Sequence, residues 1–193
     1  MKQTRKDLRF IDFCSGIGAG RLGLELLGLN CVAHSEINID SDYTYQIFFN
    51  DNRNLGDLTL LDYDCIPESD ILIAGFPCQT FSIVGKRAGF EDERGQIIYY
   101  LKDILEHKNI PYFILENVKG LINHNNGRSL NSIIKLLNNS GYEVAYKVLN
   151  SIDYGVPQLR ERVYFVGIRK DLYTKPFEFP KPVKHKKIKD FLL

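Results

Sequence analysis

A lone cysteine, Cys78, stands where a predicted strand gives way to a turn. The apolar run 70–74 is short enough to be a buried strand, and Gly75 and Pro77 then interrupt it. In open α/β sheets the carboxyl end of a strand faces the ligand crevice. A thiol at this position is a strong nucleophile, although only a few per cent of it is ionised at neutral pH. The alternative is a small buried hydrophobic side chain, because free cysteine is often buried.

A glycine-rich turn follows the first predicted strand. Residues 8–13 have a strand pattern, residues 14–20 contain Gly16 and Gly18, and residues 21–27 have a helical pattern with Gly28 as the expected C-cap. Strand, glycine turn and helix in this order bring the backbone close to a cofactor in α/β folds. The two glycines are expected to form the tight turn and to leave room for that cofactor.

Acidic residues also follow predicted strands. Glu36 ends the strand pattern 31–36 and lies 20 residues after Gly16, the spacing at which a carboxylate accepts hydrogen bonds from ribose hydroxyls. Its alternative is an ordinary exposed glutamate. Asp57 follows in a loop, and Glu116 comes directly after the strand pattern 112–115. We expect all of these groups to meet at the carboxyl edge of one sheet.

The remaining pattern predicts an α/β fold. Helices are expected at 40–50, 96–108 and 129–138, with Ser129 as an N-cap and Gly141 as a stop, and further strands at 142–149 and 162–168. Alternating strands and helices predict a mostly parallel sheet with helices on both faces. The connection between the last two strands shows no clear helix, which predicts an antiparallel pair at that edge.

Length and composition indicate one soluble globular domain. The chain has 193 residues and a net charge of +1, so its overall charge selects no partner. Basic residues gather near both ends, as solvated tails or as a nucleic-acid patch. The four cysteines show no metal or disulfide spacing, and no metal is expected. Without a signal-peptide pattern or a membrane-length apolar run, a reduced cytoplasmic protein is the default expectation.

Six motifs in order resemble those of the bacterial DNA (cytosine-5) methyltransferases of restriction–modification systems. The match runs over residues 9–168 and comprises the segments 10–18, Glu36, 56–58, 75–79, 116–118 and 158–162. The resemblance implies a Rossmann-like methyltransferase sheet that binds S-adenosylmethionine, with duplex DNA as the substrate. It also implies a catalytic domain at 1–173 and a Pro/Lys-rich linker at 174–193, leading to a target-recognition domain that these residues do not include.

The resemblance assigns roles residue by residue. Cys78 is implied as the catalytic nucleophile, Glu116 as the group that contacts the target cytosine, and Arg162 and Arg160 as holders of the base and the phosphates. For Arg160 a surface salt bridge is the alternative. The implied cofactor-binding residues are Phe13, Cys14, Gly16, Ile17, Gly18, Glu36, Ile37, Asp57, Leu58, Pro77 and Ile97, and the implied DNA-binding residues are Gln79, Ser82, Arg94 and Gln158. Cys14 and Ile37 depart from the family, because many relatives carry aromatic residues there.

The implied chemistry explains these residue types. A thiolate that adds to carbon 6 of cytosine breaks the aromaticity of the ring and makes carbon 5 nucleophilic. Glu116 is expected to support the charge that develops at ring nitrogen 3, which requires a raised pKa of the kind that burial produces. The base must be flipped out of the duplex, and the glycine-hinged segment 79–95 is expected to close behind it.

Three alternatives remain open from the sequence. A nicotinamide-dependent oxidoreductase accounts for the glycine turn and Glu36 but leaves Cys78 and Glu116 unexplained. The RNA-directed branch of the same family usually has a second proline before the cysteine, and Phe76 stands at that position here. A silent truncated fragment that binds a partner or DNA would keep the same motifs. The absence of the family's last two motifs also predicts a heterodimer with a second chain that carries them.

Overall fold

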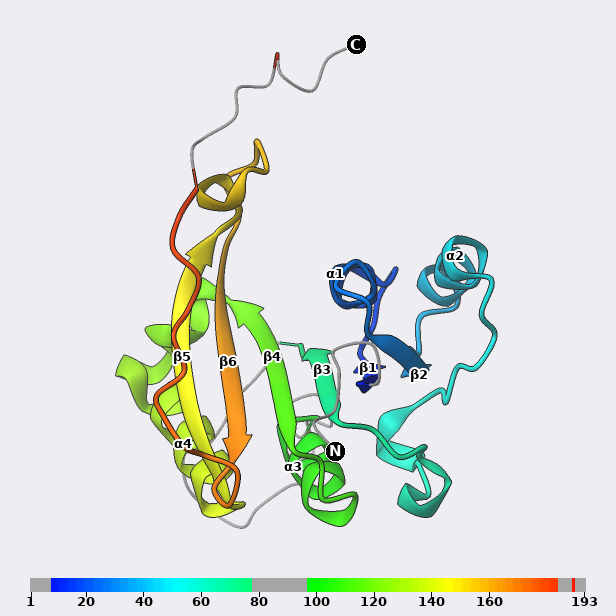
Figure 1. Ribbon diagram of the computed structural model, residues 1–193, viewed down its shortest axis with the longest axis horizontal. Coiled ribbons are helices and arrows are strands. Elements are labelled where there is room, and N and C mark those ends of the chain that lie inside the picture. The colour runs from blue at the N-terminus through cyan, green and yellow to red at the C-terminus, as the bar shows by residue number, and fades with distance from the viewer. Residues whose placement is uncertain (1–7, 78–96, 184–188, 190–193) are drawn as a thin grey trace.

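Six strands form one sheet in the computed structural model, which describes residues 8–77, 97–183 and 189 (Figure 1). The strands are β1 (Arg9–Phe13), β2 (Asn30–Ser35), β3 (Ile71–Gly75), β4 (Tyr112–Val118), β5 (Tyr142–Asn150) and β6 (Glu161–Arg169). The α-helices are α1 (Ala19–Glu25), α2 (Ile39–Phe49), α3 (Ile97–His107) and α4 (Arg128–Asn139). Short 3₁₀ helices lie between them at Leu58–Leu60, Tyr63–Cys65, Lys119–Ile122, His124–Gly127 and Ser151–Tyr154.

The sheet has the order β2-β1-β3-β4-β6-β5. Strand β1 is parallel to both β2 and β3, and β3 is parallel to β4, whereas β6 runs antiparallel to both of its neighbours, β4 and β5. The predicted mostly parallel sheet with an antiparallel pair at one edge is therefore confirmed. Since the carboxyl ends of parallel strands share one edge, β1, β2, β3 and β4 deliver their following residues to the same side.

Alternate residues along the strands face two different helix layers, as the period of two requires. Ile11 and Leu72 belong to the larger core cluster, which also contains residues of α3 and α4. Phe10 faces the opposite side, where it packs with Leu24 of α1, and Ile73 packs against that smaller cluster. Helices thus cover both faces of the sheet, as the sequence predicts.

Two helix caps differ from the sequence-based expectation. Helix α4 begins at Arg128 with Gly127 as its N-cap, so Ser129 lies inside the helix. Its hydroxyl is buried and lies 2.6 Å from Nδ1 of His124, which gives it a partner other than the backbone N–H groups that an N-cap serves. Helix α1 ends at Glu25 with Leu26 as the C-cap, and Gly28 (φ +85°) instead forms the turn into β2.

Strand β4 extends past its predicted end, so Glu116 lies inside the strand and not after it. The cause is β6, which pairs with β4 through the whole stretch from Tyr112 to Val118. Glu116 lies directly opposite Tyr164 of β6 and also pairs with Gly75 of β3. The acid is consequently fixed by a strand on each side.

Beyond β6 the chain has no regular secondary structure up to residue 183 and runs back along the β5–β6 side of the sheet (Figure 1). The N–H of Val183 donates to the carbonyl of Asp153, and the Tyr154 hydroxyl donates to the carbonyl of Pro180. The predicted linker at 174–193 therefore contacts the β5–β6 connection in its described part. In the described part of the chain, the helices are too short or too polar to cross a membrane.

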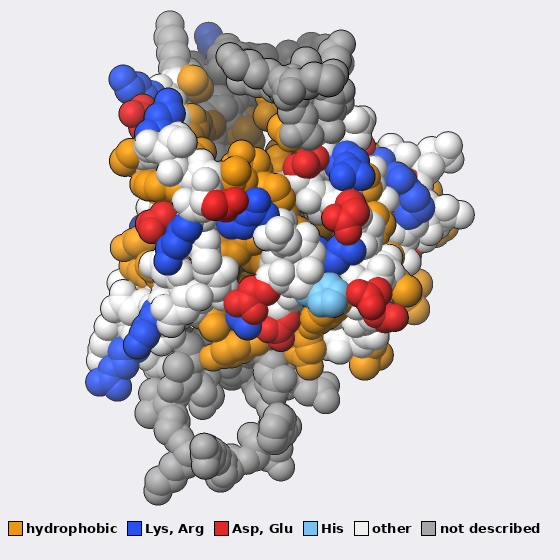
Figure 2. All heavy atoms as spheres, turned by 60° about the horizontal axis from the view of Figure 1, so that its bottom comes forward, with side chains coloured by type: hydrophobic (Ala, Val, Ile, Leu, Met, Phe, Trp, Pro, Cys, Tyr) orange, Lys and Arg blue, Asp and Glu red, His pale blue; other side chains and the backbone are white. Residues whose placement is uncertain are grey.

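The face opposite the carboxyl ends of the parallel strands has an even mixture of charges. Figure 2 shows acidic and basic side chains interspersed there. Several of these charges form ion pairs, among them Lys108 with Glu68 (2.7 Å) and Lys102 with Glu106 (2.7 Å). Such partly exposed pairs contribute little to stability, and among the described residues on this face the two signs of charge stay mixed.

Candidate functional site

The turn after β1 has the left-handed backbone that the glycine pattern predicts. Gly16 and Gly18 have φ values of +54° and +90°, and Cys14, which lacks the freedom of glycine, has φ +50°. A Cβ at Gly18 would lie 2.3 Å from the ring of Phe49. A Cβ at Gly16 would meet nothing within 4 Å, so the backbone there is open on that side. Gly18 is therefore required for packing against α2, and Gly16 by its backbone conformation.

Glu36 is held directly beside this turn. One carboxylate oxygen accepts a hydrogen bond from the N–H of Gly16 (2.8 Å), and the other accepts one from the N–H of Asn38 (2.8 Å). Each oxygen keeps a second lone pair for another donor. The 20-residue spacing noted in the sequence thus corresponds to direct contact, and the carboxylate is oriented before any ligand arrives.

Asp57 is the second acid at this edge. Its Oδ1 accepts hydrogen bonds from both the N–H (2.8 Å) and the hydroxyl (2.7 Å) of Thr59. It thereby caps the short helix Leu58–Leu60, whose Leu58 side chain is buried in the core. This cap fixes the position of the carboxylate at the end of the loop.

These elements enclose a pocket of about 470 Å³, which falls within the usual range for small-molecule sites, roughly 300–1,000 Å³. Seven of the predicted cofactor residues line it: Cys14, Glu36, Ile37, Asp57, Leu58, Pro77 and Ile97. Four further residues line it without having been predicted: Ser35, Asn38, Thr59 and Gly75. Ser35, Asn38 and Thr59 are each a chain neighbour of a predicted residue, and Gly75 lies two residues before Pro77, so closeness in the chain is the signal that could have found them.

Four other predicted cofactor residues do not line the pocket. Phe13 is fully buried in the core, and Ile17 is exposed. Gly16 and Gly18 belong to the adjoining turn, where Gly16 contributes the N–H that orients Glu36. The lining supplies two carboxylates and the apolar side chains of Leu58, Ile37 and Ile97. Such a set fits a ligand that combines ribose hydroxyls, a flat base and a positive charge, as S-adenosylmethionine does.

Burial changes the ionisation of two groups near the pocket. Burial raises the pKa of Asp12 to about 8, against the opposing effect of Arg21. One oxygen of this carboxyl, Oδ2, is buried without a hydrogen-bond partner. Burial, reinforced by the negative charges of Glu36, Asp12 and Asp57, raises the pKa of the Cys14 thiol to about 12. Cys14 is therefore a protonated wall of the pocket at neutral pH, not a nucleophile.

Glu116 lies next to this pocket, with the two predicted arginines. Its Oε1 is 3.0 Å from Nε of Arg162 and 3.9 Å from the guanidinium of Arg160. Its Oε2 lies 3.6 Å from the position that a Cβ on Gly75 would take, and Gly75 lines the pocket. The Glu116 side chain is 26% exposed, so the expected burial against an apolar strand end is only partial.

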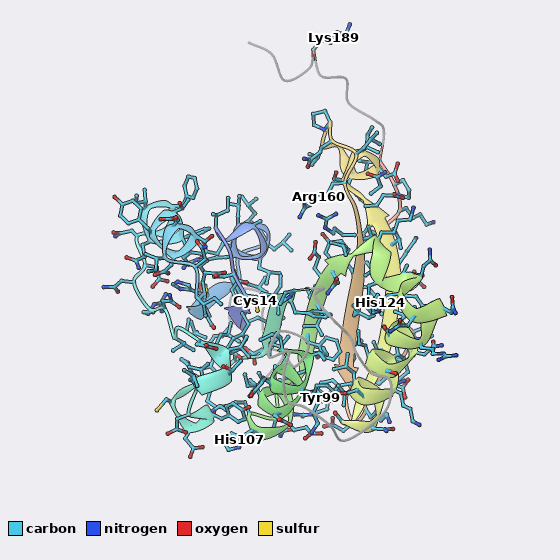
Figure 3. All side chains as sticks on the ribbon, turned by 180° about the vertical axis from the view of Figure 1, so that it is seen from behind. Cys14, Tyr99, His107, His124, Arg160 and Lys189 are labelled. Atoms are coloured by element: carbon cyan, nitrogen blue, oxygen red, sulfur yellow. The ribbon has the colours of Figure 1, made fainter. Side chains whose placement is uncertain are left out.

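The arginines come from the β5–β6 connection and from the start of β6. Arg162 pairs with Val118 of β4 in the ladder, which places its side chain beside that of Glu116. Arg160 projects from the connection towards the half of the molecule that contains Cys14 (Figure 3). Gln158 is exposed in the same connection, and its carbonyl accepts a hydrogen bond from the Ser151 hydroxyl. The alternative role of Arg160, a surface salt bridge, corresponds to a long contact of 3.9 Å between its guanidinium and the Glu116 carboxylate.

A buried amide fixes the start of the segment that leads to the predicted nucleophile. The side chain of Asn117, 2% exposed, donates from Nδ2 to the carbonyl of Phe76 (2.9 Å). Pro77 follows and lines the pocket. The predicted residues Cys78, Gln79, Ser82 and Arg94 lie outside the described residues. Sequence reasoning did not single out Asn117 beyond its place in a motif.

Among the described residues, no three His, Cys, Asp or Glu side chains lie close enough together to hold a metal ion. The three cysteines that the structure describes, Cys14, Cys31 and Cys65, are free thiols. The charged groups described at this edge are the carboxylates of Glu36, Asp57 and Glu116 and the guanidinium groups of Arg160 and Arg162.

Comparison with known proteins gives consistent matches. The family model for C-5 cytosine-specific DNA methylase matches residues 8–192. The type II methyltransferase M.HhaI of Haemophilus parahaemolyticus is 42% identical over 187 residues, which are 96% of this chain and 57% of that protein. M.NgoBI of Neisseria gonorrhoeae is 44% identical over 173 residues, covering 90% of this chain and 53% of that protein. The chain thus spans about half the length of these relatives.

Solved structures agree with this result. A protein from an E. coli prophage, described as a DNA modification methyltransferase, superposes with a TM-score of 0.77 at 26% identity, covering 95% of this chain and 53% of its own. A DNMT2 mutant of Spodoptera frugiperda superposes with a TM-score of 0.72 at 28% identity, covering 96% of this chain and 57% of its own. The family match over nearly the whole chain and the shared sheet lead to one conclusion: this chain belongs to the C-5 cytosine-specific DNA methylase family.

Proposed function

We propose that these residues form the cofactor-binding and catalytic part of an enzyme that methylates carbon 5 of cytosine in duplex DNA. The observation that carries the proposal is the pairing of Gly75 with Glu116 between β3 and β4. Gly75 lines the pocket, and Glu116 beside it is held by Arg162 at 3.0 Å. A cofactor in the pocket and a base against Glu116 would therefore be neighbours.

Enzymes of this family use S-adenosylmethionine, which supplies an electrophilic methyl group when it is bound. In the proposal, the free lone pairs of Glu36 accept hydrogen bonds from the ribose hydroxyls. Asp57 and Leu58 face the adenine end, and Ile37 and Ile97 exclude water along the pocket. Cys14 contributes an uncharged wall, because its thiol is protonated at neutral pH.

Chemistry on the base is assigned to Cys78 and Glu116. The Cys78 thiolate adds to carbon 6, and the electron pair of the carbon 5–carbon 6 bond becomes available at carbon 5, where it would form the new bond to the methyl group. The methyl–sulfur bond would break with its electron pair left on sulfur, so the departing group would be S-adenosylhomocysteine. Glu116 contacts ring nitrogen 3 and the exocyclic amine, where charge changes during this addition. After methylation, loss of the proton on carbon 5 restores the double bond and expels the thiolate. Arg162 orients Glu116 through the ion pair and offers its remaining donors to the base carbonyl.

Contacts with DNA are assigned to the segments that flank this site. Arg160 and Gln158 are exposed in the β5–β6 connection, where phosphates of a bound duplex could reach them. Gln79, Ser82 and Arg94 keep the DNA-contacting roles that the family resemblance implies. Because the reacting carbon is inaccessible in a stacked duplex, the base must be flipped out. We assign recognition of the DNA sequence to protein outside these 193 residues, either a further part of the enzyme or a second chain.

Two assays test this function together. Radiolabelled S-adenosylmethionine and mixed-sequence duplex DNA should give labelled DNA, with this chain alone or with the proteins encoded beside it. A duplex that carries 5-fluorocytosine at the target should become covalently attached to the wild-type chain, because the fluorine cannot leave as a proton does. A silent fragment would bind the cofactor or DNA without either product.

The nucleophile is tested by a matched pair of cysteine variants. Cys78→Ser should abolish both turnover and trapping, because a serine hydroxyl is not ionised there without a dedicated base. Cys14→Ser should leave trapping in place, because the Cys14 thiol is protonated and serves only as a pocket wall. Trapping that is lost in Cys14→Ser and kept in Cys78→Ser contradicts the assignment.

A further inference from the structure

Asn54 uses its amide group to join the two acidic corners of the pocket. Its Oδ1 accepts hydrogen bonds from the N–H of Glu36 (3.1 Å) and from the N–H of Gly56 (2.8 Å). Its Nδ2 donates to the carbonyl of Glu36 (3.0 Å). Both acceptor sites of the amide oxygen and one of the two N–H donors are thus occupied.

These partners also fix which way the amide points. Two N–H groups face the oxygen and a carbonyl faces the nitrogen, so the reversed orientation would bring like groups together.

The backbone that Asn54 holds belongs to both acids of the pocket. It binds Glu36 through both backbone groups, and Gly56 directly precedes Asp57. Gly56 has φ +75°, and its carbonyl accepts a hydrogen bond from the Ser35 hydroxyl (2.6 Å). The chain on each side of Asn54 also pairs with His34, since Leu55 N–H donates to the His34 carbonyl (2.8 Å). Asn54 therefore couples the end of β2 to the loop that carries Asp57.

We propose that Asn54 is a positioning residue of the cofactor pocket, which sets the separation of the Glu36 and Asp57 carboxylates by binding the backbone beside each one. This inference rests on the proposed function, in which those carboxylates hold the cofactor. Asn54 does not line the pocket and acts through Glu36 and Gly56. Preorganised supporting contacts of this kind decide how well a site fits its ligand.

The first test measures binding of S-adenosylhomocysteine by calorimetry. Asn54→Ala is expected to weaken binding about 10-fold, because two or more hydrogen bonds that orient the acids are lost. In a Glu36→Ala background the same substitution is expected to change the affinity less than about 2-fold, since its main route to the ligand is gone. Asn52→Ala is the matched control, because Asn52 is exposed, two residues away and outside the pocket. Equal losses from Asn54→Ala in both backgrounds overturn the proposal.

The second test needs no ligand, so it separates this inference from the proposed function. Amide hydrogen exchange in the unliganded chain should become faster in Asn54→Ala at Gly16 and Asn38, whose N–H groups bind the Glu36 carboxylate, and stay unchanged in β4. Should Asn54→Ala fail to fold, Asn54→Asp keeps an acceptor oxygen for the two N–H groups, while its second oxygen replaces the donors and brings a negative charge to the Glu36 carbonyl. Unchanged exchange at Gly16 and Asn38 in a folded variant overturns the inference, even if wild-type protein binds the cofactor. Failure of wild-type protein to bind S-adenosylhomocysteine, with exchange altered as expected, overturns the proposed function alone.

Discussion

The two halves of the sheet hold their charged groups in different ways. In the parallel half, Glu36 and Asp57 are fixed by backbone N–H groups, and among the described residues the ionisable side chains of Asp12, Arg21 and Asp51 are buried. In the antiparallel half, Glu116 is fixed by two neighbouring strands and by Arg162, and both partners stay partly exposed. Residues in loops at strand ends thus form the pocket, whereas the paired strands orient a single side chain, that of Glu116.

We infer from this difference that the two halves of the sheet have different roles. Backbone donors in turns suit a ligand that must be held repeatedly in one orientation, because turns hold the acids without large side-chain movement. An arginine–carboxylate pair at the rim suits a base that arrives from outside, since its exposed donors can still reach a substrate. The comparison predicts that substitutions in the two halves separate binding of the cofactor from transfer of the methyl group.

The largest separation is expected for Glu116→Gln. Its methyl-transfer rate, measured in whichever assembly methylates DNA, should fall by roughly 100- to 10,000-fold, the usual contribution of acid–base assistance. Affinity for S-adenosylhomocysteine should stay unchanged, because Glu116 does not line the pocket. Glu161→Gln is the control, since Glu161 pairs with Lys119 on the neighbouring surface (2.8 Å). A parallel loss of affinity in Glu116→Gln contradicts the division.

Stability should depend on the buried charges of the parallel half. Asp51 binds Arg21 at 2.6 Å, with both side chains less than 10% exposed, and Arg21 joins α1 to the hydroxyl of Tyr45 in α2. Asp51→Ala should lower the free energy of unfolding by about 3–5 kcal/mol, because it removes the buried partner of Arg21 and leaves only the partly exposed Glu25 (2.7 Å) to balance its charge. Asp103→Ala, which breaks an exposed pair with Lys102, should cost under about 1 kcal/mol. Urea denaturation compares the two variants directly.

Cofactor affinity should respond to Glu36→Ala. Loss of charge-assisted hydrogen bonds to the ribose should weaken binding by roughly 1.5–3 kcal/mol per bond, and Asp57→Ala should act in the same direction. Calorimetric titration with S-adenosylhomocysteine measures both variants, with Glu116→Gln as the reference that binds normally. Unchanged affinity in Glu36→Ala would contradict the assignment of the acids of the parallel half to the cofactor site.

A smaller effect is expected from pH. The pKa of Asp12 is raised from 3.8 to about 8 in the folded chain, so folding favours its protonated form. The stabilisation from this proton is complete below pH 3.8 and is lost as the pH rises towards 8. Around neutrality this contributes at most about 1.4 kcal/mol per pH unit. Asp12→Asn should flatten that slope in thermal unfolding between pH 6.5 and 7.5, and an identical slope in both proteins argues against the shift.

The sequence predicts the elements whose signal is local. The strand–turn–helix around Gly16, the acid at Glu36 and the antiparallel edge pair all follow from spacing and from the order of apolar runs, and the structure contains each of them. Glu36 could be predicted because the contact between the turn after β1 and the end of β2 occurs at a recurrent spacing of 20 residues. Such a fixed spacing can be read directly from the sequence.

Contacts between distant side chains and backbone leave no such pattern. Asn54 bonds Glu36 across 18 residues and Asn117 bonds Phe76 across 41, with no repeat that would mark either one. Nothing in the sequence marks Gly167 as a required glycine either, although a Cβ there would lie 2.0 Å from the ring of Phe113. The extension of β4 through Glu116 also escaped prediction, because β6 causes it from more than 40 residues away.

The order of the strands has a consequence for synthesis of the protein. Strand β6 is made after β5 yet lies between β4 and β5, so β5 has no place in the sheet until residue 169 has left the ribosome. The pocket of the parallel half lies entirely within residues 14–97 and can assemble earlier. Only when β6 inserts does Arg162 reach Glu116. A nascent chain would thus be able to hold its cofactor before the charge pair beside the base site exists.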